Sequence, residues 1–429
     1  MLSLAAHLDL EKGKVIRVMG PASIVINKGK IRILGMNFTP GARVVIHRYR
    51  SYAIKALEDS TISVILGEGG GIEEPAAGEE VIDVWEEASR AIIDSKGIAV
   101  VLGPVDSGKT SFSLLVANMA IEQGLRPAIV DADVGQGDLA PPGFIAMKIL
   151  TTPLLWLREV RGDVMRLIGS ITPTHAFAMS RLIVAIRDLV DIAMQKGAAP
   201  IVVNTDGWTT GYLAIDTKLN IIRAVHADYV AVLDDVLCER IKRALGPLVN
   251  VLCLPRPKVV KERDRIDRRL LRKQHYQSFF QKAKRVCLRL SEITLLNSCL
   301  ASGTLWSLDA VEKLSKELGL KVYAVVEHDD ALVVLLEKAD SVIGQRLREV
   351  FPQKEIYVVT RDSVKGLLAA ILNERLEEVA PALIDSLELD RNEICVLTEY
   401  DGVVKGLSIS RIKLSSEWEE VGKVIKCPL

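Results

Sequence analysis

The residues that could do chemistry are concentrated between positions 97 and 137 of this 429-residue chain. A short, unbroken apolar run, Gly97 to Leu102, is typical of a strand that is buried on both faces. It leads into GPVDSGKT at residues 103–110, and then into an apolar-periodic segment that ends near Gly124, as a helix would. A strand, the pattern G-x-x-x-x-G-K-[ST] and a helix, in this order, predict a phosphate-binding loop.

This loop predicts a site for a nucleoside triphosphate. Its glycines let successive backbone N–H groups point at phosphate oxygens, and the start of the helix adds partial positive charge. We expect Lys109 to bridge the β- and γ-phosphates and the Thr110 hydroxyl to bind Mg²⁺. The predicted ATP-binding residues are Gly103, Pro104, Val105, Asp106, Ser107, Gly108, Lys109, Thr110 and Ser111. An ordinary glycine-rich turn is the alternative interpretation.

A second motif, DADVGQG at residues 131–137, follows the predicted strand Pro127–Val130. Its aspartates, Asp131 and Asp133, are two residues apart and therefore project to the same side of an extended chain. One carboxylate can hold the magnesium shell while the other faces an incoming nucleophile. Either aspartate alone could instead cap the next turn.

A length of 429 residues is enough for two or three domains, and the 49% of apolar residues are enough to form sizeable cores. The formal net charge of zero argues neither for nor against nucleic acid. The first 14 residues lack a signal-peptide pattern and no apolar run approaches a membrane span, so we expect a cytoplasmic protein without membrane contact. The six cysteines are scattered without a C-x-x-C pair, which predicts small buried hydrophobes in a reducing compartment and not a zinc site or a disulfide framework.

Three domains are predicted from the spacing of the apolar runs, around an α/β core. Short alternating runs in residues 1–83 predict a small antiparallel β-sandwich or barrel. The second predicted domain comprises residues 84–285. Within it, alternating strands and helices in residues 96–255 predict a mostly parallel sheet with helices on both faces and ligands at the carboxyl ends of its strands. Residues 286–429 mix strand-like runs with helical ones, including an expected helix at 375–387, and predict an α+β or β-barrel-like domain.

Residues 256–285 form a basic segment at the end of the second domain. They contain 12 lysines and arginines against 3 acidic residues, a net charge of +9. Two interpretations are open: a solvated helical face, or an electrostatic role beside the nucleotide.

Five stretches together resemble the polynucleotide 5′-hydroxyl kinase family, which includes the kinase-like subunit of pre-mRNA cleavage factor, ribosomal-RNA-processing kinases and single-chain archaeal relatives. They are GPVDSGKTS (103–111), DADVGQGDLAPPG (131–143), GSITPTH (169–175), VNTDGW (203–208) and the Arg-rich segment near 263–268. The phosphate loop alone is generic, but the D-x-D-x-G-Q and N-T-x-G-W pair is specific. The resemblance implies a P-loop kinase core flanked by a small N-terminal β domain and a C-terminal domain.

The resemblance also implies an activity, which is transfer of the γ-phosphoryl group of ATP to the 5′-hydroxyl of RNA, with DNA as a second acceptor. ATP and Mg²⁺ are the implied cofactors, and RNA-processing proteins are implied partners. Lys109 and Thr110 match the residues that bind the ATP phosphates and Mg²⁺. Asp131 and Asp133 match the pair that holds the metal and orients the attacking hydroxyl, with Asp133 as the base.

Further roles are implied for residues on other segments. Gln136 matches a contact to the substrate phosphate, and Trp208 matches the aromatic on which the terminal base stacks. Thr172 matches the clasp around the phosphate-loop lysine. Arg263 and Arg268, five residues apart, match the two lid arginines, and Arg265 and Arg269 are the competing assignment.

Simpler interpretations stand beside these. Trp208 could be a core residue, and Thr172 could be a turn residue before a proline. His175 and His275 are expected to be surface histidines, and Asp206 stands where a neutral residue is expected.

Two other functions are compatible with an ATP site. The first is a catalytically silent ATP-binding scaffold of an RNA-processing complex, which the intact lysine, carboxylates and arginines disfavour. The second is a GTPase switch, which is disfavoured because the sequence has no N-K-x-D guanine motif.

Overall fold

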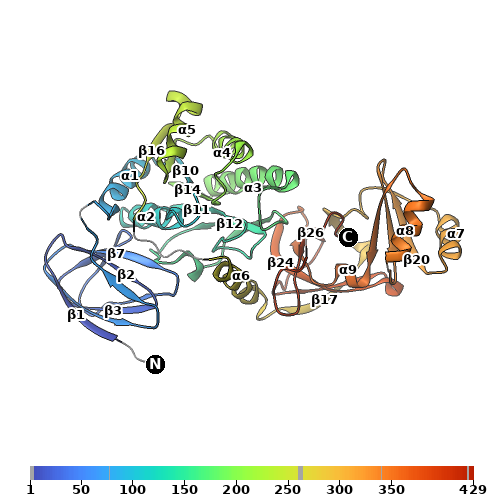
Figure 1. The fold of residues 1–429 in the computed structure, drawn as a ribbon, viewed down its shortest axis with the longest axis horizontal. Coiled ribbons are helices and arrows are strands. Elements are labelled where there is room, and N and C mark those ends of the chain that lie inside the picture. The colour runs from blue at the N-terminus through green and yellow to red at the C-terminus, as the bar shows by residue number, and fades with distance from the viewer. Residues whose placement is uncertain (1–3, 77, 259–263, 340, 423–424) are drawn as a thin grey trace. The chain divides into compact units, whose positions relative to one another are not determined.

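The computed structural model describes residues 4–76, 78–258, 264–339, 341–422 and 425–429. The chain divides into two compact units, drawn in Figure 1. The first comprises Met1–Ala140, Ile145–Asp163 and Pro173–Arg268, and the second comprises Pro141–Phe144, Val164–Thr172 and Arg269–Leu429. The three domain boundaries expected from the sequence stay a prediction. Among the described residues, no helix has the length and apolar character needed to cross a membrane.

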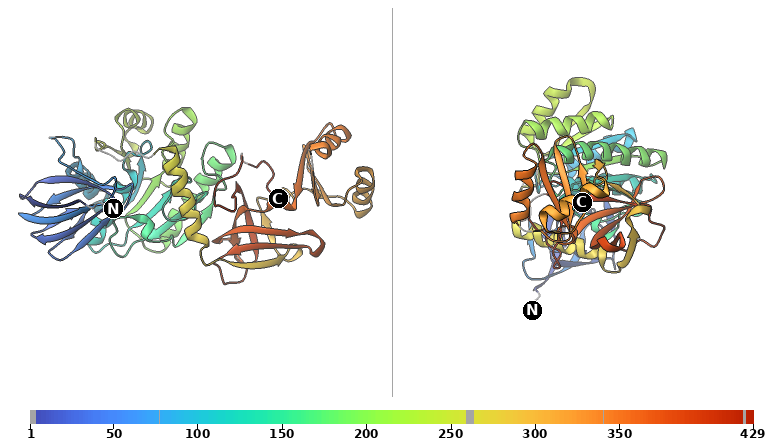
Figure 2. Two further views of the ribbon diagram at one scale, coloured as in Figure 1. Left: turned by 60° about the horizontal axis from the view of Figure 1, so that its bottom comes forward. Right: turned by 90° about the vertical axis from the view of Figure 1, so that its right-hand side faces the viewer.

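The first unit begins with two antiparallel sheets, drawn in blue in Figure 2. Their strand orders are β1-β8-β3-β6 and β5-β4-β7-β2-β9. In β8, Ile62, Val64 and Leu66 are buried while Ile65 between them is exposed, as expected for a sheet with one face on a core. The strands are β1 (Leu4–Leu10), β2 (Val15–Met19), β3 (Ala22–Lys28), β4 (Ile31–Ile33), β5 (Met36–Phe38), β6 (Arg43–Ile46), β7 (Ser51–Ala56), β8 (Ser60–Leu66) and β9 (Gly71–Glu73).

A seven-stranded sheet with the order β13-β12-β11-β14-β10-β15-β16 carries the predicted motifs. Strand β10 is parallel to β14 and β15, and β11 is parallel to β14, so the expected parallel core is present. Strand β12 was not anticipated, and it runs antiparallel to β11. The strands are β10 (Ile98–Leu102), β11 (Ala128–Ala132), β12 (Phe144–Ile149), β13 (Val164–Leu167), β14 (Ile201–Thr205), β15 (Tyr229–Val232) and β16 (Asn250–Cys253).

Helices follow the central strands, and the helix that ends near Gly124 lies where apolar periodicity predicted it. Helix α2 packs on β14 and β11, and α3 packs on the same two strands and runs along α4. The helices are α1 (Ile82–Ser95), α2 (Lys109–Glu122), α3 (Ala176–Gln195), α4 (Tyr212–Ala224) and α5 (Asp235–Leu245). The basic segment contains α6 (Arg265–Phe280).

The second unit contains a six-stranded sheet, β17-β25-β24-β23-β26-β18, and a four-stranded sheet, β19-β20-β21-β22. This agrees with the α+β alternative for the C-terminal part. The strands are β17 (Lys284–Arg289), β18 (Thr294–Leu296), β19 (Thr304–Leu305), β20 (Val322–Glu327), β21 (Ala331–Leu336), β22 (Glu355–Thr360), β23 (Leu367–Leu372), β24 (Glu378–Glu388), β25 (Glu393–Thr398) and β26 (Gly406–Lys413). Its helices are α7 (Leu308–Leu318), α8 (Ser341–Val350) and the single turn α9 (Arg361–Val364).

The helix expected at residues 375–387 is wrong, because this segment forms strand β24. It pairs with β23 on one side and β25 on the other. Pro381 lies inside the segment and has no backbone N–H to donate within a helix, which disfavours a helical interior. Pairing with two neighbouring strands therefore stabilises an extended conformation where local periodicity predicted a helix.

The interpretation of the cysteines as unpaired hydrophobes is also wrong, because all six form disulfides. The pairs are Cys238–Cys253, Cys287–Cys395 and Cys299–Cys427. Partners lie 15, 108 and 128 residues apart in sequence, so spacing carried no signal. Cys287 and Cys395 meet because strands β17 and β25 place them in register.

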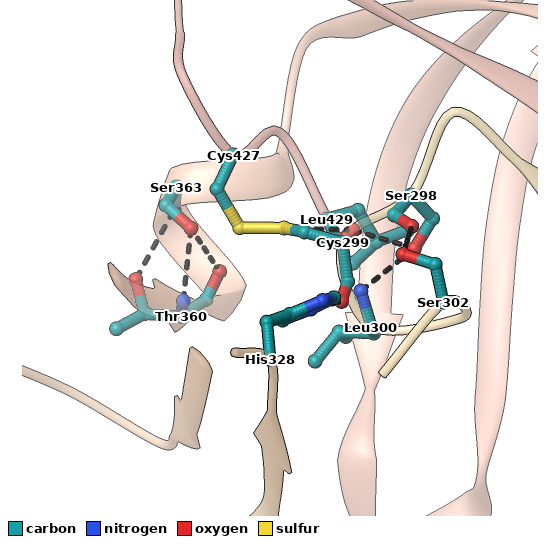
Figure 3. The surroundings of a disulfide bond; sticks show 9 residues. All are labelled: Ser298, Cys299, Leu300, Ser302, His328, Thr360, Ser363, Cys427 and Leu429. Atoms are coloured by element: carbon teal, nitrogen blue, oxygen red, sulfur yellow. Dashed lines mark hydrogen bonds between the residues drawn. A yellow bond between two sulfur atoms is a disulfide. The ribbon is translucent and has the colours of Figure 1, made fainter. Parts of the chain in front are cut away.

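Figure 3 shows the disulfide that joins Cys299 to Cys427 near the carboxyl end of the chain. The Ser298 hydroxyl donates to the backbone carbonyl of Leu429, and the ring of His328 hydrogen-bonds to the carbonyl of Cys299 at 2.9 Å. The last residues are therefore fixed to the second unit by a covalent bond and by hydrogen bonds.

We predict that reduction lowers the thermal stability of the protein. In the chain-entropy description, closing a loop of about 15 residues contributes about 3 kcal/mol and a loop of about 100 residues contributes about 5 kcal/mol. Calorimetry with and without a phosphine reductant should show a lower melting temperature after reduction. The variant Cys287→Ala/Cys395→Ala should melt at a lower temperature than the wild type even without reductant. Six reactive thiols in the denatured, unreduced protein would contradict the pairing.

Candidate active site

The phosphate-binding loop lies between β10 and α2, as predicted. Gly108 precedes the first residue of α2 and has a φ of 97°, a conformation that favours glycine. A Cβ atom at Gly108 would lie 2.6 Å from the ring of Trp85, which is buried on α1. The loop therefore requires glycine here both for its backbone turn and for its packing.

Lys109 is buried at the start of α2, and its ammonium donates a hydrogen bond to the Pro104 carbonyl at 2.7 Å. Burial lowers the pKa of Lys109 to about 8, against the opposing effect of the carboxylates of Asp133 and Asp206. A phosphate group would supply the negative charge that favours the protonated lysine. The lysine is thus placed inside the loop, as the motif predicts.

Thr110 and Asp131 are brought together by Asn204, which lies in the VNTDGW stretch but was given no role of its own from the sequence. The Asn204 amide donates to the Thr110 hydroxyl at 3.2 Å and to Asp131 Oδ1 at 3.0 Å. Burial raises the pKa of Asp131 to about 7, with a further contribution from the charge of Asp138. Asn204 follows the apolar run of β14, so its position at the carboxyl end of a strand was the signal that could have identified it.

Asp133 follows β11 and holds the DVGQG turn. Its Oδ1 accepts hydrogen bonds from the backbone N–H groups of Gly135 and Gln136, at 3.0 and 2.9 Å. Burial raises the pKa of Asp133, and the charge of Asp206 adds to this increase. The turn-capping interpretation and the catalytic one are therefore compatible, because capping fixes the direction of the carboxylate. The side chain of Gln136 donates to the Gly135 carbonyl at 2.9 Å.

The residues around the loop fit a magnesium nucleotide. Within the described part of the chain, the buried Ser107 hydroxyl and Asn204 Oδ1 have no hydrogen-bond partner. The loop and the end of β14 therefore each have a polar atom that is available to bind a ligand. The same described residues contain no group of three or more histidine, cysteine or acidic side chains that could hold a metal alone. Mg²⁺ in kinases is held by one or two protein ligands together with phosphates, which suits Thr110 and Asp131.

The NTDGW segment after β14 contacts the phosphate loop. A Cβ atom at Gly207 would lie 2.8 Å from the backbone nitrogen of Val105, so the two loops approach closely. The carboxylate of Asp206 accepts from the Trp208 backbone N–H at 2.7 Å and from the fully buried Lys218 ammonium at 2.6 Å. This buried ion pair accounts for Asp206, whose presence the sequence left unexplained. Trp208 itself is partly exposed, which argues against a core role.

Three of the four candidate lid arginines, Arg265, Arg268 and Arg269, lie in the described part of the chain. Arg268 Nη2 donates to Asp106 Oδ2 of the phosphate loop at 3.2 Å. Arg269 donates instead to Glu419, at 2.7 Å, and Arg265 is exposed. Arg263 lies outside the described residues. Arg268 thus contacts the phosphate loop, and which arginines form the lid stays a prediction.

The sequence singled out three further residues, whose own surroundings the structure describes. Thr172 belongs to the second unit, where its backbone N–H donates to the Ser170 hydroxyl at 3.2 Å, and its approach to Lys109 stays a prediction. His175 is exposed, as expected. His275 is not a surface histidine, because it is 3% exposed and its ring lies 5.2 Å from that of Phe279 on α6.

Comparison with known proteins agrees with the motifs. Residues 103–282 match the family model described as mRNA cleavage and polyadenylation factor CLP1 P-loop. The chain is 26% identical over 328 residues to the polyribonucleotide 5′-hydroxyl-kinase of Thermococcus kodakarensis, covering 75% of this chain and 90% of that relative. It is 26% identical over 351 residues to the enzyme of the same name from Pyrococcus furiosus, covering 79% and 94%. The family resemblance predicted from the motifs is confirmed.

The fold has a counterpart among solved structures. The Clp1p chain of a Clp1p–Pcf11p complex superposes with a TM-score of 0.66 at 14% identity, covering 96% of this chain and 98% of that one. At this identity the likeness concerns the fold, and it extends over nearly the whole length of both chains.

We predict that breaking the buried pair beneath Trp208 destabilises the protein. Lys218→Met leaves the Asp206 carboxylate buried without its cation, which should lower the free energy of unfolding by about 3–5 kcal/mol. Denaturant titration of the full chain measures this loss. The double variant Asp206→Asn/Lys218→Met should recover part of it, because the unpaired charge is gone. Strictly additive losses would show that the two side chains do not interact.

Proposed function

We propose that this chain, whose residues 103–282 match the CLP1 P-loop family, is an ATP-dependent kinase of the 5′-hydroxyl end of RNA, with DNA as a second acceptor. The observation that supports this most is the arrangement at the carboxyl ends of β10, β11 and β14. There, Asn204 joins the phosphate-loop Thr110 to Asp131. The carboxylate of Asp133, two residues further along, favours the protonated form of Lys109 by raising its pKa. Asp133 also caps the turn after β11, but a kinase needs in addition a carboxylate beside the loop that can orient an acceptor hydroxyl.

The nucleotide and its metal are held by a small number of side chains. Thr110 and Asp131 would hold Mg²⁺, which when bound neutralises negative charge on the β- and γ-phosphates. Lys109 would leave the Pro104 carbonyl and bind phosphate oxygens, because a phosphate anion is a stronger acceptor than a peptide carbonyl. The backbone N–H groups of the loop complete the cradle.

Asp133 would act on the acceptor hydroxyl. The 5′-oxygen forms a bond to the γ-phosphorus while the bond from that phosphorus to the β–γ bridging oxygen breaks, and the hydroxyl proton passes to Asp133. A ribose hydroxyl is a weak acid, so the carboxylate chiefly orients it and accepts the proton late. The raised pKa of Asp133, caused mainly by burial, suits a group that must accept a proton.

The remaining predicted residues would serve the substrate and the transferred group. Arg268 would reach the γ-phosphate, a role that its hydrogen bond to Asp106 of the loop supports, and Arg263 stays a predicted second lid arginine. Gln136 would contact the substrate phosphate, Trp208 would stack on the terminal base, and Thr172 would engage Lys109.

Partners and location form part of the same proposal. Because the solved relative is a complex of Clp1p with Pcf11p, we also propose an RNA-processing protein partner. We place the protein in the cytoplasm; its disulfides do not exclude this, since intracellular proteins of hyperthermophiles can be rich in them.

The test of the proposal is transfer of radiolabelled γ-phosphate to 5′-hydroxyl oligonucleotides of RNA and DNA. We expect transfer by the wild type and its loss in Lys109→Ala, because the lysine acts on phosphate charge. The variant should keep a cooperative melting transition. Wild-type protein that binds ATP but labels neither oligonucleotide would favour the scaffold, and an active Lys109→Ala would remove the lysine from the mechanism.

A second prediction concerns Trp208. Stacking of a base on an aromatic ring contributes about 1–3 kcal/mol, so Trp208→Ala should raise KM for the oligonucleotide roughly 5- to 150-fold. The KM for ATP should change little. Trp208→Phe, which keeps a stacking surface, is the matched control, and its KM for the oligonucleotide should lie between those of the wild type and Trp208→Ala. If Trp208→Ala instead melts many degrees lower with unchanged KM, the side chain is part of the core.

A further inference from the structure

Asp138, seven residues after Asp131 and just beyond the turn that follows β11, is a buried carboxylate held between two arginines. Arg50 Nη2 donates to one carboxylate oxygen at 2.7 Å. Arg158 contacts the other oxygen through Nε at 3.0 Å and Nη2 at 2.9 Å. The side chain of Asp138 is 6% exposed and each arginine side chain is 17% exposed, so these ion pairs are largely protected from solvent. Charge-assisted hydrogen bonds in such surroundings restrict the geometry of all three side chains.

The backbone of Asp138 transmits this restriction to Asp131. The Asp138 N–H donates to Asp131 Oδ2 at 2.6 Å, while Asn204 donates to Asp131 Oδ1 at 3.0 Å. Both carboxylate oxygens of Asp131 are therefore oriented, one through Asp138 and the other through the residue that also contacts Thr110. None of the functional roles proposed above uses Asp138, Arg50 or Arg158.

Arg50 comes from the N-terminal sheets, in the loop between β6 and β7. Its own backbone is fixed, since its carbonyl accepts from the N–H of Gly20 at 2.9 Å and its N–H donates to the His47 carbonyl at 3.1 Å. Its guanidinium lies 5.3 Å from the centroid of the Trp156 ring, and that of Arg158 lies 5.6 Å from the same ring. The two guanidinium groups thus both contact the Trp156 ring, as cation–π pairs do, and both bind the Asp138 carboxylate.

The loop that carries Trp156 and Arg158 is fixed in turn. The Tyr52 hydroxyl on β7 donates to the Leu155 carbonyl at 2.6 Å. Asn118 on α2 bonds to both backbone groups of Leu154, at 2.8 and 2.9 Å. Arg50 and Arg158 are therefore presented to Asp138 by segments that are themselves anchored to β7 and to the helix of the phosphate loop.

We infer that Arg50 and Arg158 are positioning residues for the metal-binding carboxylate of Asp131 and act through Asp138, so that the N-terminal β sheets take part in building the magnesium site. The inference rests on the proposed function in so far as Asp131 is taken as a metal ligand. Residues that orient a metal ligand without touching the metal typically change metal affinity or activity by about 10- to 100-fold when they are replaced.

The experiment measures binding of a fluorescent ADP analogue to the full-length protein as Mg²⁺ is titrated, with no oligonucleotide present. Arg50→Ala should raise the Mg²⁺ concentration for half-maximal binding by about 10- to 100-fold, while binding in EDTA stays as in the wild type. Arg50→Lys should restore part of the affinity, since lysine keeps the charge but not the planar fork. The matched control is Arg43→Ala, which removes an exposed arginine of the same sheets that bonds to Ser23, and it should leave the titration unchanged.

A double-variant cycle distinguishes positioning from general stability. In an Asp138→Ala background, Arg50→Ala should change the Mg²⁺ midpoint by less than about twofold, because its route to Asp131 is already broken. An unchanged midpoint in Arg50→Ala, with only a lower melting temperature, would overturn the inference. If Arg50→Ala does not fold, Arg158→Ala gives the same test, since it contacts the other oxygen of Asp138. A protein that fails the phosphoryl-transfer assay but shows this Mg²⁺ effect would refute the proposed kinase activity and leave the positioning role standing.

Discussion

The candidate active site depends on buried charges that compensate one another. Lys109 is buried in the phosphate loop, and the carboxylates of Asp133 and Asp206 partly offset the cost of keeping its charge. Asp206 is in turn paired with the fully buried Lys218. Charges of this kind are tolerated away from water only when partners with good geometry are present. The positions of β11, β14, α2 and α4 relative to one another are therefore constrained by electrostatics as well as by apolar packing.

The side chains at the carboxyl ends of β10, β11 and β14 form a site for a charged ligand whose polar groups are already oriented. Parallel strands β10, β11 and β14 end side by side, and each contributes a different function: the phosphate loop, the aspartate pair and the Asn204–Trp208 segment. Hydrogen bonds to backbone groups fix each carboxylate before any ligand is present. A group that is already oriented stabilises developing charge without reorganising during the reaction.

Outside the central sheet, the N-terminal sheets contribute to this site, and the second unit is described by itself. The N-terminal sheets supply Arg50, which reaches Asp138 and through it Asp131. The second unit is held by its own sheets and by two of the three disulfides, and it contains Thr172. The six cysteines show that a chain can combine a phosphate-loop core with covalent crosslinks, although composition alone favoured free thiols.

The sequence by itself determined where the phosphate loop, Lys109, Thr110 and the paired aspartates lie, because these motifs consist of residues that are contiguous or two apart on one strand and its loop. Only the tertiary structure decided the partner of Asp206, the link through Asn204, the disulfide pairs and the strand β24. Each of these depends on contacts between segments far apart in the chain, such as the 108 residues between Cys287 and Cys395. Local periodicity carries no information about such contacts, and for β24 pairing on both edges outweighed a helical pattern.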